Sequence, residues 1–225
     1  NGSRGSSDSG TRPNYTISGK FGNALEFDGV NDFVNVSYSK SLNITGNITL
    51  MAWINWKGET GNFQSVIEKS ESNAIFDYEL ALTNIANPNV RFQVIGGIAD
   101  SNGAITAGRW YQIAVTYDGS NVKHYIDGNL DTTTPFTTPI TGDTREVRIG
   151  HRYDANGPFN GTIDEVAIFN RTLSADEIRN LYKRGILKLN LSYRTSNDST
   201  TFSGWKGVSN NTLSNIGERA RYLQY

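Results

Sequence analysis

Short runs of apolar or alternating residues, separated by turn-forming residues, recur along most of this 225-residue chain. Alternation with a period of two is the pattern of a strand that buries one face, and these runs are shorter than ordinary helices. They lie at 24–28, 32–37, 48–56, 64–69, 76–82, 90–97, 109–117, 122–127, 145–150 and 160–169. So many short strands between turn signals predict an all-β sandwich.

Asp-Gly pairs at 28–29, 118–119 and 127–128 provide turns, because both residue types tolerate positive φ. The pair at 118–119 lies between the alternating runs 111–117 and 122–126. We therefore expect a β-hairpin over these two runs.

One short helix is expected after the last core strand. Ser174 and Glu177 form a capping box, Ile178 and Leu181 share one face, and Gly185 can end the helix. The pattern is that of a surface helix.

Composition changes twice along the chain. Residues 1–20 are rich in Gly, Ser and Asn without periodicity and predict a linker or leader, so the sandwich domain is placed at 21–184. Residues 185–225 hold strand-like runs around a Ser/Thr/Asn-rich middle. They predict the start of a second β unit, or a tail that donates strands to the sandwich or to another chain.

Charge and composition exclude several classes of partner and site. The net charge is −1 with no Lys/Arg-rich run, so we expect no nucleic-acid partner. No apolar run approaches the roughly 20 residues that span a bilayer, so no membrane span is expected in this chain. Cysteine is absent, which excludes thiolate zinc sites and cysteine nucleophiles.

Asn-x-Ser/Thr sequons are dense. They begin at Asn1, Asn14, Asn35, Asn43, Asn47, Asn160, Asn170, Asn190, Asn197 and Asn210. A chain rich in these residues makes some sequons by chance, but ten favour a glycosylated extracellular or cell-surface protein. Because glycans need solvent, the best acceptors are those near turns or strand ends, and the predicted set is Asn14, Asn43, Asn47, Asn170, Asn190, Asn197 and Asn210.

Five ordered motifs resemble those of laminin-G-like domains of the concanavalin A-like lectin/glucanase superfamily. They are ALEFDGVNDFV at 24–34, ITLMAWI at 48–54, GRWYQIAVTYDG at 108–119, YIDG at 125–128 and FNGTIDEVAIFNRTLS at 159–174. The resemblance implies a two-sheet antiparallel jelly-roll sandwich with one short C-terminal helix, in agreement with the strand pattern.

A calcium site is predicted between the first and last of these motifs. Asp32 and Asp164 have the strand parity of apolar residues, and a buried carboxylate needs a partner. The resemblance implies a structural calcium there, with oxygen ligands from Asp28, Gly29, Asn31, Asp32 and Asp164. The alternative is that Asp28 and Asn31 form the turn by side-chain hydrogen bonds and Asp164 accepts backbone N–H bonds.

Catalytic patterns are missing from the sequence. Retaining glucanases of this fold carry alternating Glu, Asp and Glu on one strand, and no such run occurs. Asp164 and Glu165 are sequential and point to opposite faces of their strand. His124 and His151 lie in no protease or triad pattern, and we interpret them as solvated side chains. We therefore expect no enzyme activity.

Two places are candidates for ligand binding. Trp53 has the parity opposite to Leu50 and Ile54, so it faces a groove where a sugar can stack, unless loops or the tail cover it. The second place is the loop at 151–159, with Tyr153, Asp154 and Phe159.

The favoured function is a noncatalytic lectin-like or adhesion module of a larger surface protein, with carbohydrate or a cell-surface protein as partner. A purely structural subunit of a surface layer or filament, which self-associates by strand exchange through its tail, is the first alternative. An accessory domain of a glycosidase is the second.

The calcium hypothesis predicts a change in thermal stability. Because a ligand that binds only the folded state stabilises it, excess chelator should lower the melting temperature measured by calorimetry, and added calcium should restore it. An unchanged transition would contradict the calcium site.

Overall fold

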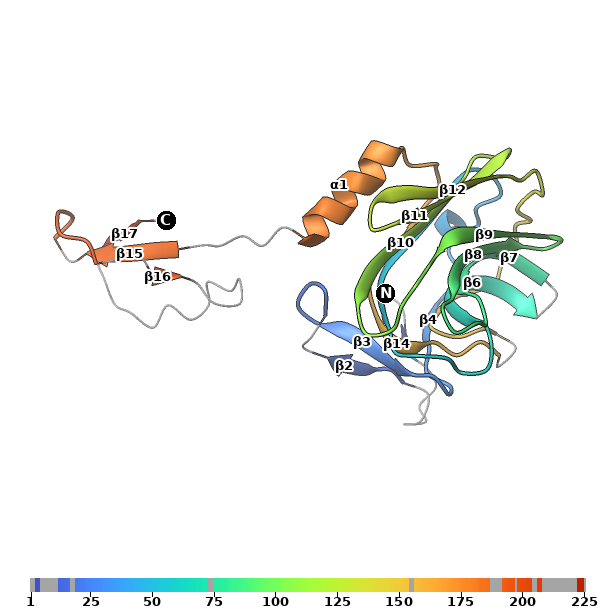
Figure 1. The fold of residues 1–225 in the computed structure, drawn as a ribbon, viewed down its shortest axis with the longest axis horizontal. Coiled ribbons are helices and arrows are strands. Elements are labelled where there is room, and N and C mark those ends of the chain that lie inside the picture. The colour runs from blue at the N-terminus through green and yellow to red at the C-terminus, as the bar shows by residue number, and fades with distance from the viewer. Residues whose placement is uncertain are drawn as a thin grey trace. The chain divides into compact units, whose positions relative to one another are not determined.

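The computed structural model describes residues 3–4, 12–16, 19–72, 75–153, 156–186, 192–196, 198–203, 206–207 and 222–224. Backbone contacts divide the chain into two compact units, Asn1–Gly185 and Ile186–Tyr225, and each is described by itself. In its described residues, the larger unit is a two-layered antiparallel β-sandwich with one α-helix (Figure 1). The predicted all-β, two-sheet sandwich is therefore confirmed.

Each layer of the larger unit is a seven-stranded sheet among the described residues. The first sheet has the order β1 (Ser3–Arg4), β4 (Val34–Val36), β13 (Val147–Ile149), β6 (Gln64–Ser72), β7 (Ile75–Leu82), β8 (Asn89–Val94) and β9 (Gly97–Ala104). The second has the order β12 (Asn129–Pro135), β11 (Asn121–Ile126), β10 (Trp110–Tyr117), β5 (Ile48–Trp56), β14 (Asn160–Phe169), β3 (Ala24–Asp28) and β2 (Asn14–Thr16). Neighbours such as β5 and β14 are far apart in sequence, as in a jelly roll.

The core lies between the two sheets. Alternate residues of β5, β7, β8 and β10 supply it, including Leu50, Ile54, Leu80, Phe92 and Ile113, all fully buried. Period-two alternation aims each set at the opposite sheet, which is why the sequence pattern identified these strands.

Helix α1 (Ala175–Ile186) covers the outer face of the second sheet, over β10 and β11. Its predicted capping box is present: Ser174 Oγ accepts from the Glu177 N–H at 3.2 Å, and Glu177 Oε2 accepts from the Ser174 N–H at 2.9 Å. Ile178 is buried against Met51 and Tyr125.

Gly185 does not end the helix as predicted, because α1 continues through it to Ile186. A Cβ on Gly185 would come within 2.3 Å of the Trp53 ring. The absence of a side chain therefore lets the helix approach the sheet closely.

Tight turns connect the strands where Asp-Gly pairs predicted them. The hairpin of β10 and β11 turns at Asp118, whose Oδ1 accepts from the N–H groups of Ser120 and Asn121 at 2.9 and 2.7 Å. Asp127 and Gly128 both have positive φ, 52° and 73°, and join β11 to β12 in a two-residue turn.

Three segments depart from the sequence prediction. The first twenty residues are not only a linker, since Asn14–Thr16 pairs with β3 and Ser3–Arg4 pairs with β4. Strands β9 and β12 were missed because their sequences, GIADSNGA and NLDTTTP, are small and polar. Both strands pair at the edges of their sheets, where side chains need not be large and apolar.

The smaller unit contains a three-stranded antiparallel sheet. Strand β15 (Ser192–Ser196) pairs with β16 (Lys206–Gly207) and with β17 (Tyr222–Gln224). The predicted second β unit therefore has strands that pair with one another within this chain, and strand donation to another chain stays a prediction.

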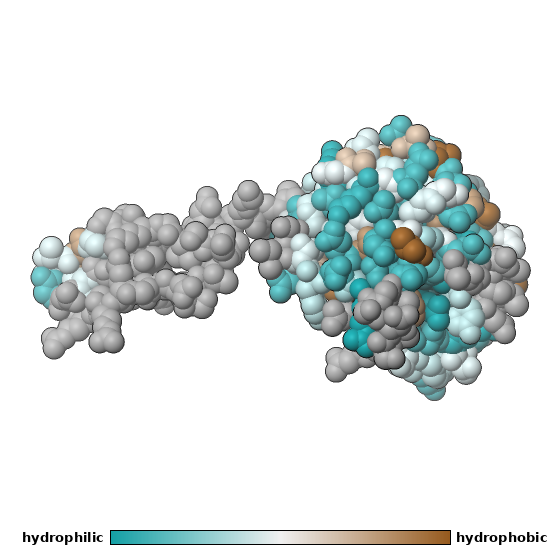
Figure 2. All heavy atoms as spheres, turned by 90° about the horizontal axis from the view of Figure 1, so that it is seen from below, coloured by the Kyte–Doolittle hydropathy of each residue, from teal (hydrophilic) through white to brown (hydrophobic). Residues whose placement is uncertain are grey.

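The surface of the larger unit is mainly polar on the face in Figure 2, where hydrophobic residues are separated by hydrophilic ones. Such scattered apolar residues are normal for a globular surface. Among the described residues, no helix is long and apolar enough to cross a membrane.

Candidate functional site

A row of polar side chains crosses the outer face of the first sheet. Cross-strand register places Asn35, Arg148, Glu68, Glu79 and Gln93 side by side on β4, β13, β6, β7 and β8. Directly opposed residues of neighbouring strands project from the same face. Most residues next to them along these strands belong to the core, so the row lies on the face away from the second sheet.

Two buried glutamates form the centre of the row. Glu68 is 1% exposed and Glu79 is fully buried. Arg152 donates from Nε and Nη2 to the Glu79 carboxylate at 2.8 and 2.7 Å. The Ser70 hydroxyl and the Tyr153 N–H donate to Glu68, the latter at 2.8 Å. The glutamates therefore hold residues 152 and 153 onto the sheet.

The pKa of Glu68 reflects this surrounding. Burial, and then the negative charge of Glu79, raise the pKa of Glu68 to about 8, although bonds from Ser70 and the Tyr153 N–H and the charge of Arg152 act in the opposite direction. Glu68 is therefore mainly protonated at pH 7, so the buried Glu79 carboxylate has no second negative charge beside it.

A pocket of about 400 Å³ opens beside the row. It is lined by Thr144, Arg145, Glu146, Arg148 and Tyr153, which come from β13 and the segments before and after it. The Tyr153 ring is 49% exposed, so an aromatic surface is available at the rim. A ligand in this concave site would meet oriented polar groups and one exposed aromatic ring.

The Arg148 side chain is fixed in the pocket wall. Its guanidinium lies 4.7 Å from the centre of the Phe33 ring and 4.5 Å from that of Tyr153. Nε and Nη2 both donate to Glu146 Oε1 at 3.1 Å, and Asn35 Nδ2 donates to Glu146 Oε2 at 2.6 Å. The donor and acceptor groups are therefore oriented before any ligand arrives.

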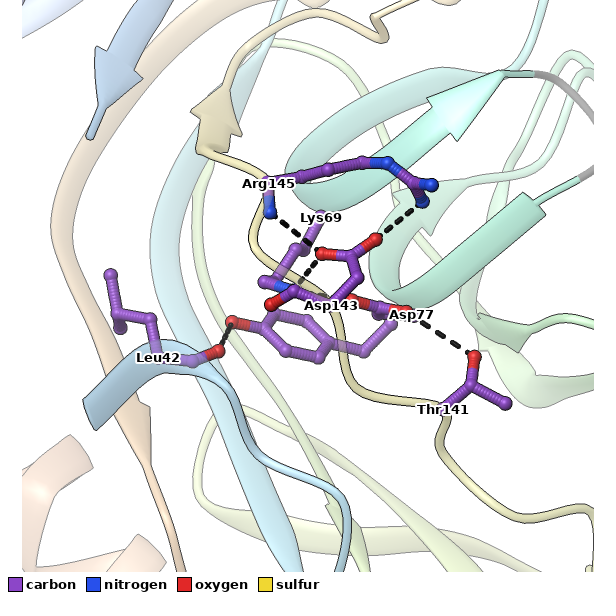
Figure 3. A network of polar contacts seen from close by, with 7 residues as sticks. Leu42, Lys69, Asp77, Thr141, Asp143 and Arg145 are labelled. Atoms are coloured by element: carbon purple, nitrogen blue, oxygen red, sulfur yellow. Dashed lines mark hydrogen bonds and ion pairs between the residues drawn. The ribbon is translucent and has the colours of Figure 1, made fainter. Parts of the chain in front are cut away.

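A buried lysine anchors the segment that precedes β13 (Figure 3). The Lys69 ammonium is fully buried and pairs with Asp77 and with Asp143, whose carbonyl oxygen also accepts at 3.1 Å. Asp143 in turn pairs with Arg145 and accepts from its backbone N–H at 2.8 Å. Thr141 donates to Asp77 at 3.2 Å. Lys69 thus positions one wall of the pocket.

The two aspartates have opposite pKa shifts. Burial raises the pKa of Asp77, against the effect of Lys69. Burial also acts to raise the pKa of Asp143, but the bonds from Lys69 and from the Arg145 N–H outweigh it and lower that pKa. The lowered pKa keeps Asp143 ionised, so it can hold the loop through its bonds to Lys69 and Arg145.

The predicted ligand-binding residues have different outcomes. Trp53 is 2% exposed because α1 covers it, with the Tyr182 ring stacked at 5.5 Å, so its prediction as a ligand-binding residue is wrong. Phe159 is also wrong, since it is fully buried and packs edge-on against Phe27 at 6.2 Å. Tyr153 lines the pocket, and Asp154 lies outside the described residues.

The predicted calcium ligands fall in two places. Asp28 Oδ1 accepts from the N–H groups of Val30 and Asn31 at 2.8 and 3.3 Å, and the Asp28 N–H donates to Asp32 Oδ2 at 3.0 Å. Gly29 has a φ of 76° in this turn. Burial, and then the charge of Asp28, raise the pKa of Asp32, which is 5% exposed.

Asp164 lies away from this turn. Asp28 pairs with Asn160, and Asp164 is four residues further along β14, roughly 13 Å at the rise of a strand. Its carboxylate accepts from the N–H groups of Phe21 and Glu165, both at 2.9 Å. The described residues contain no group of three or more His, Cys, Asp and Glu suited to a metal. The five residues therefore do not form one coordination shell, and calcium binding stays a prediction.

Both histidines are buried rather than solvated. His124 is fully buried on β11, and burial lowers its pKa to about 4 despite the charges of Asp100 and Asp131. His151 is 5% exposed, and its Nδ1 lies 2.6 Å from the Arg152 carbonyl oxygen. The prediction that they are solvated is wrong because edge strands and the loop at 151–153 enclose them.

The sequons differ in exposure. Asn14, Asn47 and Asn170 are exposed, whereas Asn35, Asn43 and Asn160 are half-buried. Asn1, Asn190, Asn197 and Asn210 lie outside the described residues. Exposure favours the first three as acceptors, and glycosylation stays a prediction.

The comparisons with known proteins agree with this fold. A family model described as the concanavalin A-like lectin/glucanases superfamily, of the laminin G type, matches residues 27–179. The chain therefore belongs to this family, as its motifs predicted. No curated protein sequence matches the chain significantly.

Several solved structures share the fold. Domain 4 of AbnA, a GH43 extracellular arabinanase from Geobacillus stearothermophilus solved with arabinotriose, is 19% identical with a TM-score of 0.65, over 80% of this chain and 87% of that one. The ligand binding domain of Botulinum neurotoxin serotype D, solved with N-acetylneuraminic acid, is 17% identical with a TM-score of 0.62, over 88% of this chain and 51% of that one. The heptameric SAP-like pentraxin from Limulus polyphemus is 12% identical with a TM-score of 0.51, over 67% of this chain and 81% of that one.

Replacing Glu68 should change how stability depends on pH. The raised pKa means that the folded state holds a proton that the unfolded state releases near pH 4.5, so wild-type stability falls between about pH 4.5 and 8. Glu68→Gln removes this titration. In urea unfolding, the free energy of unfolding of the variant should rise relative to that of the wild type by about 1.4 kcal/mol per pH unit in that window. Exposed Glu165→Gln should show no such trend, and a constant difference for Glu68→Gln would contradict the assignment.

Proposed function

We propose that the larger unit is a noncatalytic, extracellular carbohydrate-binding module whose ligand occupies the pocket between residues 144–148 and Tyr153. The observation that carries the proposal is an exposed aromatic ring beside an oriented Arg148–Glu146 pair. Sugars present both an apolar C–H face and hydroxyl groups, and this combination offers a partner for each.

Tyr153 supplies the stacking surface. One side of its ring is occupied by the Arg148 guanidinium at 4.5 Å, and about half of the side chain stays open to solvent. A sugar ring can pack on the open part, while hydroxyls reach Glu146 and Arg148, whose side chains are 29% and 18% exposed. The fixed side chains lose little conformational entropy on binding.

A binding role fits the central glutamates better than catalysis. A glycosidase needs two carboxyl groups that reach the scissile bond from either side. Glu68 and Glu79 have almost no exposed surface and contact Arg152 and Tyr153 instead. Their role in this proposal is to hold the loop that carries Tyr153.

A second candidate is an accessory domain of a glycosidase, which the likeness to domain 4 of an arabinanase favours. The pocket would then bring attached catalytic domains to a polysaccharide. Sequencing the regions that flank this chain in its gene distinguishes the two candidates, because a glycosidase domain is present only in the second.

Tyr153→Ala should weaken binding of an oligosaccharide identified on a glycan array by about tenfold or more, because the stacking surface is removed. Affinity is measured by calorimetry, with thermal unfolding as a check on folding. Tyr15→Ala removes a ring that is 69% exposed on β2 of the other sheet, and it should bind as the wild type does. Equal affinities for Tyr153→Ala and wild type, or no glycan bound at all, would contradict the proposal.

A further inference from the structure

The charges around the pocket are balanced. Lys69 and Arg145 pair with Asp77 and Asp143 in one cluster, and Arg148 pairs separately with Glu146, so three cations face three carboxyl groups. Next to them, Arg152 and Glu79 pair with each other. Glu68, with a pKa of about 8, adds little charge at pH 7. Among the described residues, the pocket therefore presents arginines whose charge is already compensated.

This balance acts against an anionic ligand. A carboxylate or sulfate would need the Arg148 donors that Glu146 Oε1 already accepts at 3.1 Å, and it would approach the Glu146 charge itself. The second Glu146 oxygen is fixed by Asn35 at 2.6 Å, so the glutamate is held in place from both sides. Displacing it would break charge-assisted hydrogen bonds.

A pair of neighbouring hydroxyls suits the same groups. Glu146 is an acceptor and Arg148 is a donor, both reach solvent, and a hydroxyl can donate to one while its neighbour accepts from the other. The planar guanidinium is kept in one orientation by Phe33 and Tyr153. The arrangement therefore matches a vicinal diol of an uncharged sugar.

We infer that the pocket selects neutral saccharides that present adjacent hydroxyl groups, and that Glu146 is the residue that excludes acidic ones. The inference rests on the proposed carbohydrate-binding function. Glu146 contributes both an acceptor for a neutral sugar and a negative charge against uronate or sulfate groups.

The experiment compares two oligosaccharide probes of equal length, a neutral β-1,4-galactan fragment and an oligogalacturonate, on the full chain. Calorimetry is run at about 50 and 500 mM salt, because screening weakens charge-dependent binding and leaves neutral binding nearly unchanged. The neutral probe should bind at both salt concentrations, and the acidic probe should bind about tenfold more weakly or not at all.

Glu146→Gln gives a change of opposite sign for the two probes. The variant should bind the neutral probe about tenfold more weakly, because a carboxylate acceptor is lost. It should bind the acidic probe more tightly, because the repelling negative charge is lost. Glu165→Gln, on the second sheet, should leave both affinities unchanged. Preferential, salt-sensitive binding of oligogalacturonate by the wild type would overturn the inference and leave the proposed function standing. Failure of both probes to bind, together with an empty glycan array, would overturn both the inference and the proposed function.

Discussion

The buried ion pair between Lys69 and Asp143 is the interaction on which the pocket depends. Lys69 is fully buried, and a lone ammonium at this depth would cost several kcal/mol, so the lysine must be paired. Asp143, in the loop before β13, pairs with Lys69. Asp143 also pairs with the Arg145 side chain and accepts from its backbone N–H, so Arg145 is held in place as well. The position of one pocket wall therefore follows from the need to neutralise a charge inside the sandwich.

Glu68, the residue before Lys69, fixes the other wall of the pocket from the opposite face of β6. Successive residues of a strand point to opposite faces, so one dipeptide serves both the interior and the outer surface. Glu68 accepts from the Tyr153 N–H, and Glu79 beside it binds Arg152. The two walls of the pocket are thus attached to neighbouring residues of one strand.

Helix α1 covers the outer face of the other sheet, which removes Trp53 from contact with ligands.

Much of the fold could be predicted from the sequence, because alternation and capping are local. Strands β3, β5 and β14 begin and end where their apolar patterns do, and the Ser174–Glu177 capping box is present. The residues of the pocket were harder to predict from the sequence. Glu68 and Glu79 are eleven positions apart and meet only through strand pairing, so a search for carboxylates on one strand overlooks them. Tyr153 was identified as a loop aromatic, but Arg148 in β13 and Glu146 just before it were missed, although charged residues two positions apart in a short apolar run are a detectable signal.

Hydrogen exchange in an Asp143→Asn variant tests most directly whether the buried lysine positions the pocket. The substitution keeps the shape of the side chain and leaves Asp77 to pair with Lys69, so the sandwich should remain folded. Loss of a charged hydrogen bond should make backbone amides within 141–153 exchange about tenfold faster, while amides of β5, β10 and α1 keep their wild-type rates. Unchanged exchange across 141–153, or an equal acceleration throughout the larger unit, would contradict the account.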